Sequence, residues 1–262
     1  WSFFGKLIII AMIQCGGLGV VTMITIFIRV TGKRIGLRDR ATLQSALSAP
    51  QIGGIVKLTS FIFKGTIIIE MIGALLMFPS FMKDFGVTKG IYYSIFHSIS
   101  AFCNAGFDLM GDVSKFSSLT KYQSDIMINI TIMLLILIGG LGFLIWKDIV
   151  DYRFDIKRYS IQTKIVLTMT FILVLFPSVL FFFTEFSTLD IKTRVLSSLF
   201  QAVTPRTAGF NTIDYTKFSD NGIAMTIILM LIGGGSGSTA GGIKMTTIFI
   251  LVATMCSVLK QD

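Results

Sequence analysis

The chain has 262 residues, of which 53% are hydrophobic and only 14% are charged, and its mean hydropathy is +0.80. In soluble proteins about a quarter of all residues are charged, so this composition excludes an ordinary soluble domain and predicts an integral membrane protein. The net charge of +9 does not indicate a nucleic-acid site, because the basic residues occupy short loops between apolar segments. Three widely separated cysteines, Cys15, Cys103 and Cys256, exclude a disulfide framework.

A helix that crosses a membrane needs about 20 mostly apolar residues. The last apolar stretch is too long for one span, since at about 1.5 Å per residue it would reach roughly 55 Å, against a hydrocarbon core of about 30 Å. It also contains the sequence "GGGSGSTAGG", so we predict two helical halves joined by a break. The five stretches of sufficient length are 3–28, 58–81, 126–146, 161–183 and 222–259.

Two further apolar runs, 91–103 and 195–203, are too short to cross a membrane. Each leads into an Ala-Gly-Phe sequence that suits neither a helix nor a strand. We expect re-entrant, interfacial or buried helices at these two places. Because the loops 29–57 and 147–164 carry six and five Lys or Arg residues against one and three acids, the positive-inside rule assigns both loops to the cytoplasm and both short runs to the outer side.

The sequence repeats itself. "IQCGGLGVVT" resembles "ILIGGLGFLI", and "SAFCNAGFD" resembles "QAVTPRTAGFN". The repeated unit is a spanning helix, a short re-entrant helix, an extended loop and a second spanning helix. We therefore divide the chain into 1–57, the last helix of an earlier unit with a cytoplasmic loop, and two whole units, 58–159 and 160–262. The fold class is all-α integral membrane, with about five spanning segments and two re-entrant helices.

Irregular backbone at membrane depth is tolerated only where it is buried in protein or lines water. A short helix whose C-terminus points inward directs its partial negative charge at the membrane centre, which favours a cation. Carbonyl oxygens of the following extended turn can replace the water shell of that cation, and Gly106 and Gly209 permit the backbone angles this requires. The two turns are therefore predicted to form a selectivity filter. The alternative is that both glycines only allow close helix packing.

Several other residues have a structural and a functional interpretation. We expect the "GGLG" glycines, Gly16, Gly17 and Gly19 with Gly139, Gly140 and Gly142, to let an outer helix approach a short helix. Arg206 is expected to anchor the short helix to neighbouring carbonyls rather than to face the cation, and His97 to be a hydrogen-bonded structural residue. The choice stays open for Glu70 inside a span, for Lys244 at a helix end and for Asp108 beside the turn.

Five motifs together resemble the Trk/Ktr/HKT superfamily of potassium transporters, and most closely its KtrB-type membrane subunits. They are "QCGGLG" from Gln14, "SISAFCNAGFD" from Ser98, "IGGLGF" from Ile138, "TPRTAGFNT" from Thr204 and "GGGSGSTAGGIK" from Gly233. Cys103 departs from the asparagine that the family often has there. The resemblance implies four units around one pore, so the first filter would precede Trp1 and the fourth unit, with its conserved arginine, would follow Asp262.

The resemblance also implies roles for particular residues. The filter would consist of Asn104, Ala105, Gly106, Phe107, Thr207, Ala208, Gly209 and Phe210. A gating loop under the filter would consist of Gly233, Gly234, Gly235, Ser236, Gly237, Ser238, Thr239, Ala240, Gly241 and Gly242. The function implied is channel-like potassium uptake across a bacterial plasma membrane, with possible dependence on sodium and without a bound cofactor. The partners implied are a second copy in a homodimer and a cytosolic, KtrA-like nucleotide-binding ring.

Three other classes of protein compete with this interpretation. A secondary transporter with inverted repeats would explain the broken helix, but the repeats here share one orientation. An intramembrane serine protease would use Ser236 of "GGSG", yet it needs a histidine base and His97 is the only histidine. We therefore predict that the chain is not an enzyme. A purely structural membrane subunit is the third alternative.

Overall fold

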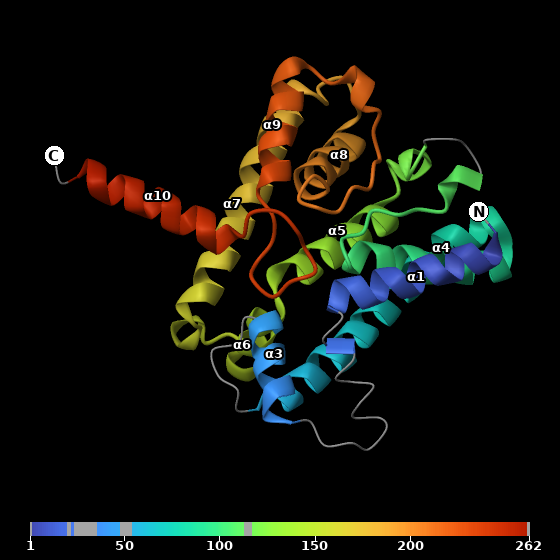
Figure 1. Cartoon of the computed structure of the whole chain (residues 1–262). Helices are drawn as coiled ribbons and strands as arrows, with labels where there is room; N and C mark the ends of the chain where they lie inside the picture. The colour runs from blue at the N-terminus through green and yellow to red at the C-terminus, as the bar shows by residue number, and fades with distance from the viewer. Residues whose placement is uncertain (1, 20–21, 24–35, 48–53, 113–116, 261–262) are drawn as a thin grey trace.

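The computed structural model describes residues 2–19, 22–23, 36–47, 54–112 and 117–260. Within these ranges the ordered elements are helices, and no β-strand is present (Figure 1). Short 3-10 turns lie in the connections, at Met110–Asp112, Thr120–Tyr122, Ile156–Arg158 and Tyr215–Lys217. The α-helices are α1 (Phe3–Leu18), α3 (Leu37–Leu47), α4 (Ile55–Phe102), α5 (Ile126–Leu141), α6 (Phe143–Tyr152), α7 (Ile161–Thr184), α8 (Ile191–Val203), α9 (Asp220–Leu231) and α10 (Met245–Leu259).

Helix α4 contains both the predicted span 58–81 and the predicted short helix 91–103. Its backbone leaves helical geometry at Gly86 (φ 77°, ψ 174°), and the residues after Gly86 fold back along those before it. The Ser98 hydroxyl donates to the Glu70 carbonyl at 2.6 Å, and a Cβ on Gly73 would lie 2.6 Å from the Ser98 Oγ. The short helix is therefore the second arm of a hairpin, and Gly86 is its corner.

Two described helices, α4 and α7, are long and apolar enough to cross a membrane, and α5 with α6 makes a third candidate if this bent pair is one span. The prediction of a single helix over 126–146 is wrong, because α5 and α6 meet at Gly142 with a bend of 97°. The predicted break in 222–259 is confirmed, since α9 ends at Leu231 and α10 begins at Met245. Of the stretch 3–28, the described helix ends at Leu18, and residues 20–21 and 24–28 lie outside the described residues.

The unit 160–262 repeats the hairpin, but its two arms are separate helices, α7 and α8, joined by residues 185–190. Helix α7 is followed by α8, whose N-cap Asp190 accepts the backbone N–H of Thr193. Arg194 on α8 donates from Nε to the Phe182 carbonyl at 2.7 Å, and its guanidinium lies 3.9 Å from the centre of the Phe182 ring. Arg194 thereby fixes the start of α8 against the end of α7. Beyond α9, helix α10 extends away from the other helices (Figure 1).

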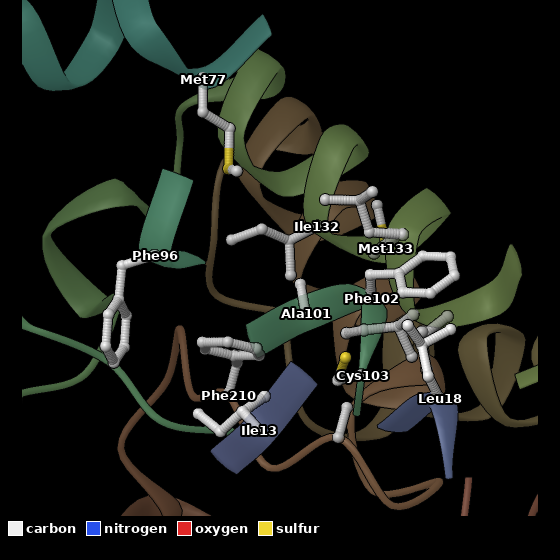
Figure 2. Packing of buried hydrophobic residues seen from close by; sticks show 14 of the residues in the cluster. Ile13, Leu18, Met77, Phe96, Ala101, Phe102, Cys103, Ile132, Met133 and Phe210 are labelled. Atoms are coloured by element: carbon white, nitrogen blue, oxygen red, sulfur yellow. The ribbon is translucent and has the colours of Figure 1, made fainter. Parts of the chain in front are cut away.

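The main hydrophobic core surrounds the second arm of α4. Figure 2 shows Phe96, Ala101 and Phe102 of this arm packed among side chains from α1 and α5. Phe210 belongs to the same core and is fully buried, although it comes from the turn that follows α8. The main core is therefore shared between the two units, while a smaller cluster around Phe181, Phe186 and Leu229 lies within the second unit.

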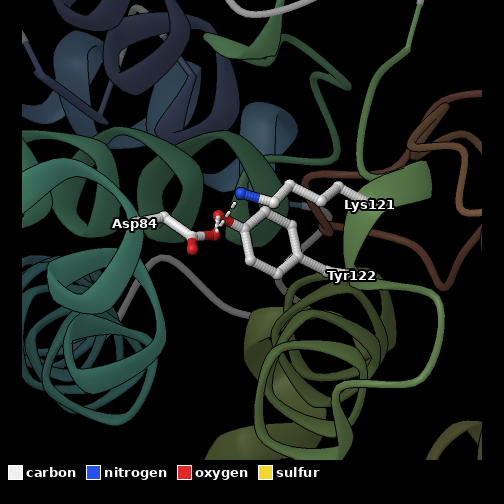
Figure 3. Close-up of polar contacts among 3 residues, drawn as sticks. All are labelled: Asp84, Lys121 and Tyr122. Atoms are coloured by element: carbon white, nitrogen blue, oxygen red, sulfur yellow. Dashed lines mark hydrogen bonds and ion pairs between the residues drawn. The ribbon is translucent and has the colours of Figure 1, made fainter.

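A polar contact ties the Gly86 corner to the connection before α5. The Tyr122 hydroxyl donates to Asp84 Oδ2 at 2.6 Å, and the Lys121 ammonium lies 2.8 Å from the same oxygen (Figure 3). Tyr122 is buried, whereas the Lys121 side chain is 56% exposed. The hydroxyl is therefore the partner that a substitution should disturb most.

We expect Tyr122→Phe to destabilise the protein by about 1.5–3 kcal/mol, because it removes a hydrogen bond to a charged carboxylate. Lys121→Met removes a solvent-exposed ion pair and should cost at most about 1 kcal/mol. The midpoint of thermal unfolding in detergent micelles compares the two variants. An equal or larger effect of Lys121→Met would contradict this ranking.

Candidate functional site

The two Ala-Gly-Phe turns, 104–107 after α4 and 207–210 after α8, lie side by side. Gly106 and Gly209 both have positive φ, at 70° and 86°. A Cβ on Gly106 would lie 2.2 Å from the Ala208 carbonyl oxygen and 3.2 Å from the Gly209 Cα. A Cβ on Gly209 would lie 3.7 Å from the Gly106 Cα. The structure thus brings together the two glycines that the sequence repeat singled out. The second turn lies so close to Gly106 that no side chain fits there.

Both turns are held by the same device. The Ser100 hydroxyl donates to the Phe107 carbonyl at 2.7 Å, and the Thr204 hydroxyl donates to the Phe210 carbonyl at 2.5 Å. In each turn a residue other than glycine also adopts positive φ, Asn104 at 51° and Thr207 at 72°. Such angles cost of order 1–3 kcal/mol each and persist only where the surroundings impose them. The hydroxyl anchors supply part of that constraint.

Each turn begins at the C-terminus of a short helix, where backbone carbonyls carry partial negative charge. Within the first turn, the Ala105 N–H donates back to the Ser100 carbonyl at 2.9 Å; within the second, the Ala208 N–H donates to the Thr204 carbonyl at 3.1 Å. The site therefore presents two helix C-termini to one small region, an arrangement that stabilises positive charge.

The segment between α9 and α10 contacts the first turn and lies close to the second. The Thr239 hydroxyl donates to the Phe102 carbonyl at 2.9 Å and accepts from Asn104 Nδ2 at 3.3 Å. A Cβ on Gly241 would lie 4.0 Å from Thr207 Cγ2. We call residues 233–242 the glycine-rich loop. Every residue predicted for the site lies in this loop or in the two turns.

The glycine-rich loop also fits into the bend between α5 and α6. The Gly235 and Thr239 N–H groups donate to the Gly140 and Gly139 carbonyls at 2.8 and 3.2 Å. The Phe143 N–H donates to the Gly237 carbonyl at 2.9 Å. The loop and the bend therefore satisfy each other's backbone groups.

The "GGLG" glycines do not all have the packing role expected of them. It is confirmed for Gly17 and Gly139, where a Cβ would lie 2.4 Å from Cys103 Sγ and 2.0 Å from the Phe102 carbonyl oxygen. It is wrong for Gly142, which forms the bend (φ 110°) and whose Cβ, if added, would lie 2.6 Å from the Ser236 carbonyl oxygen. It is also wrong for Gly16, where an added Cβ would have no atom within 4 Å.

The polar residues near the turns have mixed outcomes. His97 is a structural residue, as expected: its ring contacts the Tyr93 carbonyl at 2.7 Å and accepts the Leu109 N–H at 3.4 Å. Arg206 is buried, but the expected bonds to neighbouring carbonyls are not found. Its Nη2 lies 3.8 Å from Met245 Sδ, and its Nε and Nη1 have no hydrogen-bond partner among the described residues.

The structure supplies a partner for each of the three residues whose roles were left open. Glu70 accepts a hydrogen bond from Gln14 Nε2 at 3.1 Å. The Lys244 ammonium donates to the Ala240 carbonyl at 2.7 Å, inside the glycine-rich loop. Asp108 accepts the Met110 N–H at 2.9 Å. Lys244 thereby helps to close the loop on itself.

A cavity of about 800 Å³ lies beyond the second turn, next to Asn211 and Thr212. Glu185, Asp214 and Lys217 are among its lining residues, so acidic side chains outnumber basic ones by one. The Thr216 backbone N–H donates to Asp214, which lowers the pKa of this carboxyl. Sequence reasoning missed this acidic cavity, because Glu185 and Asp214 are 29 residues apart in the chain and belong to neither repeat motif.

In the part of the chain that the structure describes, these features define a helical membrane protein with two backbone turns at the C-termini of short helices. The chain belongs to the TrkH family of cation transport proteins, whose family model matches residues 2–262. The resemblance drawn from its motifs is thereby confirmed. Membership of a cation transport family also confirms that the chain is not an enzyme, and it removes the protease interpretation of Ser236.

Curated relatives match almost the whole chain. It is 39% identical to the potassium/sodium uptake protein NtpJ of Enterococcus hirae, over 99% of this chain and 57% of the relative. It is 38% identical to the Ktr system potassium uptake protein B of Bacillus subtilis, over 99% of this chain and 58% of the relative. The chain therefore spans less than three-fifths of the length of these relatives.

A solved structure shares the fold. The potassium transporter TrkH of Vibrio parahaemolyticus superposes with a TM-score of 0.67 at 20% identity, over 86% of this chain and 46% of that one.

We expect Gly139→Ala to destabilise the protein by about 1–3 kcal/mol, the usual cost of overpacking. The new Cβ would collide with the Phe102 carbonyl oxygen and crowd the Thr239 hydroxyl. Gly16→Ala is the matched control, since it alters the same position of the other "GGLG" motif where nothing lies within 4 Å. Thermal unfolding in detergent micelles measures both, and equal midpoints would refute the contact.

Proposed function

We propose that this chain forms part of a potassium uptake protein, and that its two turns are two quarters of a selectivity filter. One observation carries the proposal: Gly106 and Gly209, from different units, meet across a gap that admits only backbone. Relatives that match the whole chain are named as potassium or potassium/sodium uptake proteins. Potassium is the substrate, sodium is a possible second one, and no bound cofactor is required.

Carbonyl oxygens of Asn104 to Phe107 and of Thr207 to Phe210 are the proposed ligands. Backbone carbonyls can replace the hydration shell of potassium without introducing a formal charge. The helix C-termini behind them favour the cation, and the acidic cavity beyond the second turn would raise the local cation concentration. Conduction is passive and follows the membrane potential.

The glycine-rich loop is the proposed gate. It is bonded to the first turn through Thr239, which contacts the Phe102 carbonyl and Asn104. A cation leaving the filter inward would meet this loop, so permeation requires the loop to move. Its many glycines and serines make alternative conformations accessible.

The proposed location is the bacterial plasma membrane, with the loops 29–57 and 147–164 in the cytoplasm, because basic loops remain on that side. A homodimer and a cytosolic nucleotide-binding ring are the proposed partners. The support for a partner is that three of the relatives are named as components of a Ktr system.

We expect Gly106→Ser and Gly209→Ser, in the full-length protein, to weaken the apparent affinity for potassium or to admit sodium. The physical reason is that each glycine has positive φ and faces the other turn, so a side chain displaces the ligating carbonyls. Potassium and sodium uptake in a bacterium lacking its own potassium transport is the measurement.

Gly111→Ser is the control for these variants, because Gly111 is exposed and has no atom within 4 Å of its Cβ position. Unchanged uptake in both filter variants, at normal membrane levels, would show that the turns do not line the ion path. An intact gene that restores no uptake would favour a structural subunit.

Deletion of residues 234–240 should raise potassium flux and reduce its regulation, since it removes the segment bonded to the first turn. Flux into proteoliposomes measures this at a fixed membrane potential. A deletion variant with wild-type flux would exclude the loop as the gate.

A further inference from the structure

The bend between α5 and α6 occurs where the glycine-rich loop has replaced helical hydrogen bonds. In an unbroken α-helix, the N–H of residue 143 would donate to the carbonyl of residue 139, and that of residue 144 to the carbonyl of residue 140. Instead, the Gly139 carbonyl accepts the Thr239 N–H, and the Phe143 N–H donates to the Gly237 carbonyl. The Gly140 carbonyl accepts the Gly235 N–H. Three loop residues thus hold the groups that would otherwise close the helix.

These groups lie in the interior of a membrane protein, where an unsatisfied backbone group costs several kcal/mol. If the loop leaves, the Gly139 and Gly140 carbonyls and the Phe143 N–H lose their partners together. The least costly way to satisfy them again is to form the helical hydrogen bonds from residues 143 and 144 to the carbonyls of Gly139 and Gly140. A straight helix made of α5 and α6 could lie in the membrane, because the two together are long and apolar enough to cross it.

Only one residue has to change its backbone conformation substantially for this closure. Gly142 has φ 110° and ψ 144°, while α5 ends immediately before it and α6 starts immediately after it. Glycine adopts both this conformation and the helical one at little steric cost. The residues on either side are already helical, so the two arms can join by rotation at Gly142.

We propose that the glycine-rich loop and the α5–α6 helix exchange hydrogen bonds: the docked loop keeps the helix broken at Gly142, and its departure closes α5 and α6 into one straight helix. The proposal rests on the proposed function in one respect, that the loop is the gate. The closed helix then occupies the loop's docking position and holds the gate open. The gate then opens by a transition between two conformations, the docked loop with a bent helix and the released loop with a straight helix. In both, the backbone groups at the bend have hydrogen-bond partners.

Two substitutions bias the exchange in opposite directions. Gly142→Ala disfavours the bend, because alanine tolerates positive φ poorly and its Cβ would lie 2.6 Å from the Ser236 carbonyl, and it favours the straight helix. Leu144→Pro has the opposite effect. Residue 144 lies in the first turn of α6, where proline is tolerated, but in a straight helix it would fall in the interior, where proline is not. Leu144→Ala is the matched control for the proline, and Gly16→Ala controls for a glycine-to-alanine change in the other "GGLG" motif, at a position where the added Cβ has no atom within 4 Å.

The state of the helix is measured as the distance between spin labels at Met127→Cys and Val150→Cys, two exposed positions on α5 and α6. The full-length protein is used, with its native cysteines replaced and its uptake verified. At about 1.5 Å per residue, the labelled positions are about 34 Å apart in a straight helix and about 24 Å apart at the observed bend. Potassium flux into proteoliposomes is measured on the same variants.

We expect Gly142→Ala to shift the distances toward the longer value and to raise basal flux roughly five-fold, the ratio given by the helix preference of alanine over glycine. Leu144→Pro should retain the shorter distance and reduce flux below that of Leu144→Ala. Gly16→Ala should behave as the wild type.

An unchanged distance distribution in Gly142→Ala would overturn the exchange, even if deletion of 234–240 raises flux as a gate requires. A longer distance without any change in flux would support the exchange and refute the loop as the gate. If Gly142→Ala does not fold, Leu144→Pro decides the matter: a fully active Leu144→Pro protein would overturn the proposal.

Discussion

The structure depends on one constraint, that every backbone N–H and carbonyl group inside the membrane must have a partner. The glycine-rich loop has no regular structure, and α5 is interrupted beside it, so each would be costly alone. Together they pair Gly235 with Gly140, Thr239 with Gly139 and Phe143 with Gly237. Two irregular segments from different repeats are therefore stable only in each other's presence. The same pairing places the loop against the Phe102 carbonyl, at the start of the first turn.

The two turns show a related balance between strain and support. Asn104 and Thr207 adopt angles that residues with a side chain avoid, and the Ser100 and Thr204 hydroxyls hold the turns from behind. Because the anchors come from the helices and not from a cation, the turns are preorganised. A site of this kind binds by geometry already present in the protein, which reduces the ordering cost of binding.

Much of this arrangement could be predicted from the sequence. The length of 222–259 implied its break, and the repeated Ala-Gly-Phe placed Gly106 and Gly209 in equivalent positions. The bend at Gly142 could not be predicted, because "ILIGGLGFLI" reads as a continuous apolar helix and the loop that interrupts it is about 95 residues further along the chain. Likewise, no local pattern indicates that Arg206 approaches Met245, since that contact depends on how the turn after α8 lies against the start of α10.

The position of Phe210 has a consequence for how the protein is made. Its ring is fully buried in a core formed mainly by α1, α4 and α5, to which α8 adds Phe200 and Val203. Membrane proteins are synthesised and inserted from the N-terminus, so the first unit reaches the bilayer before residue 210 exists. Until then its core has an open face beside His97, whose ring centre lies 6.3 Å from that of Phe210 in the finished fold. The core of the unit 58–159 is therefore incomplete at first, with one face exposed to lipid or to the insertion machinery. It becomes complete when Phe210 of the second turn packs against it.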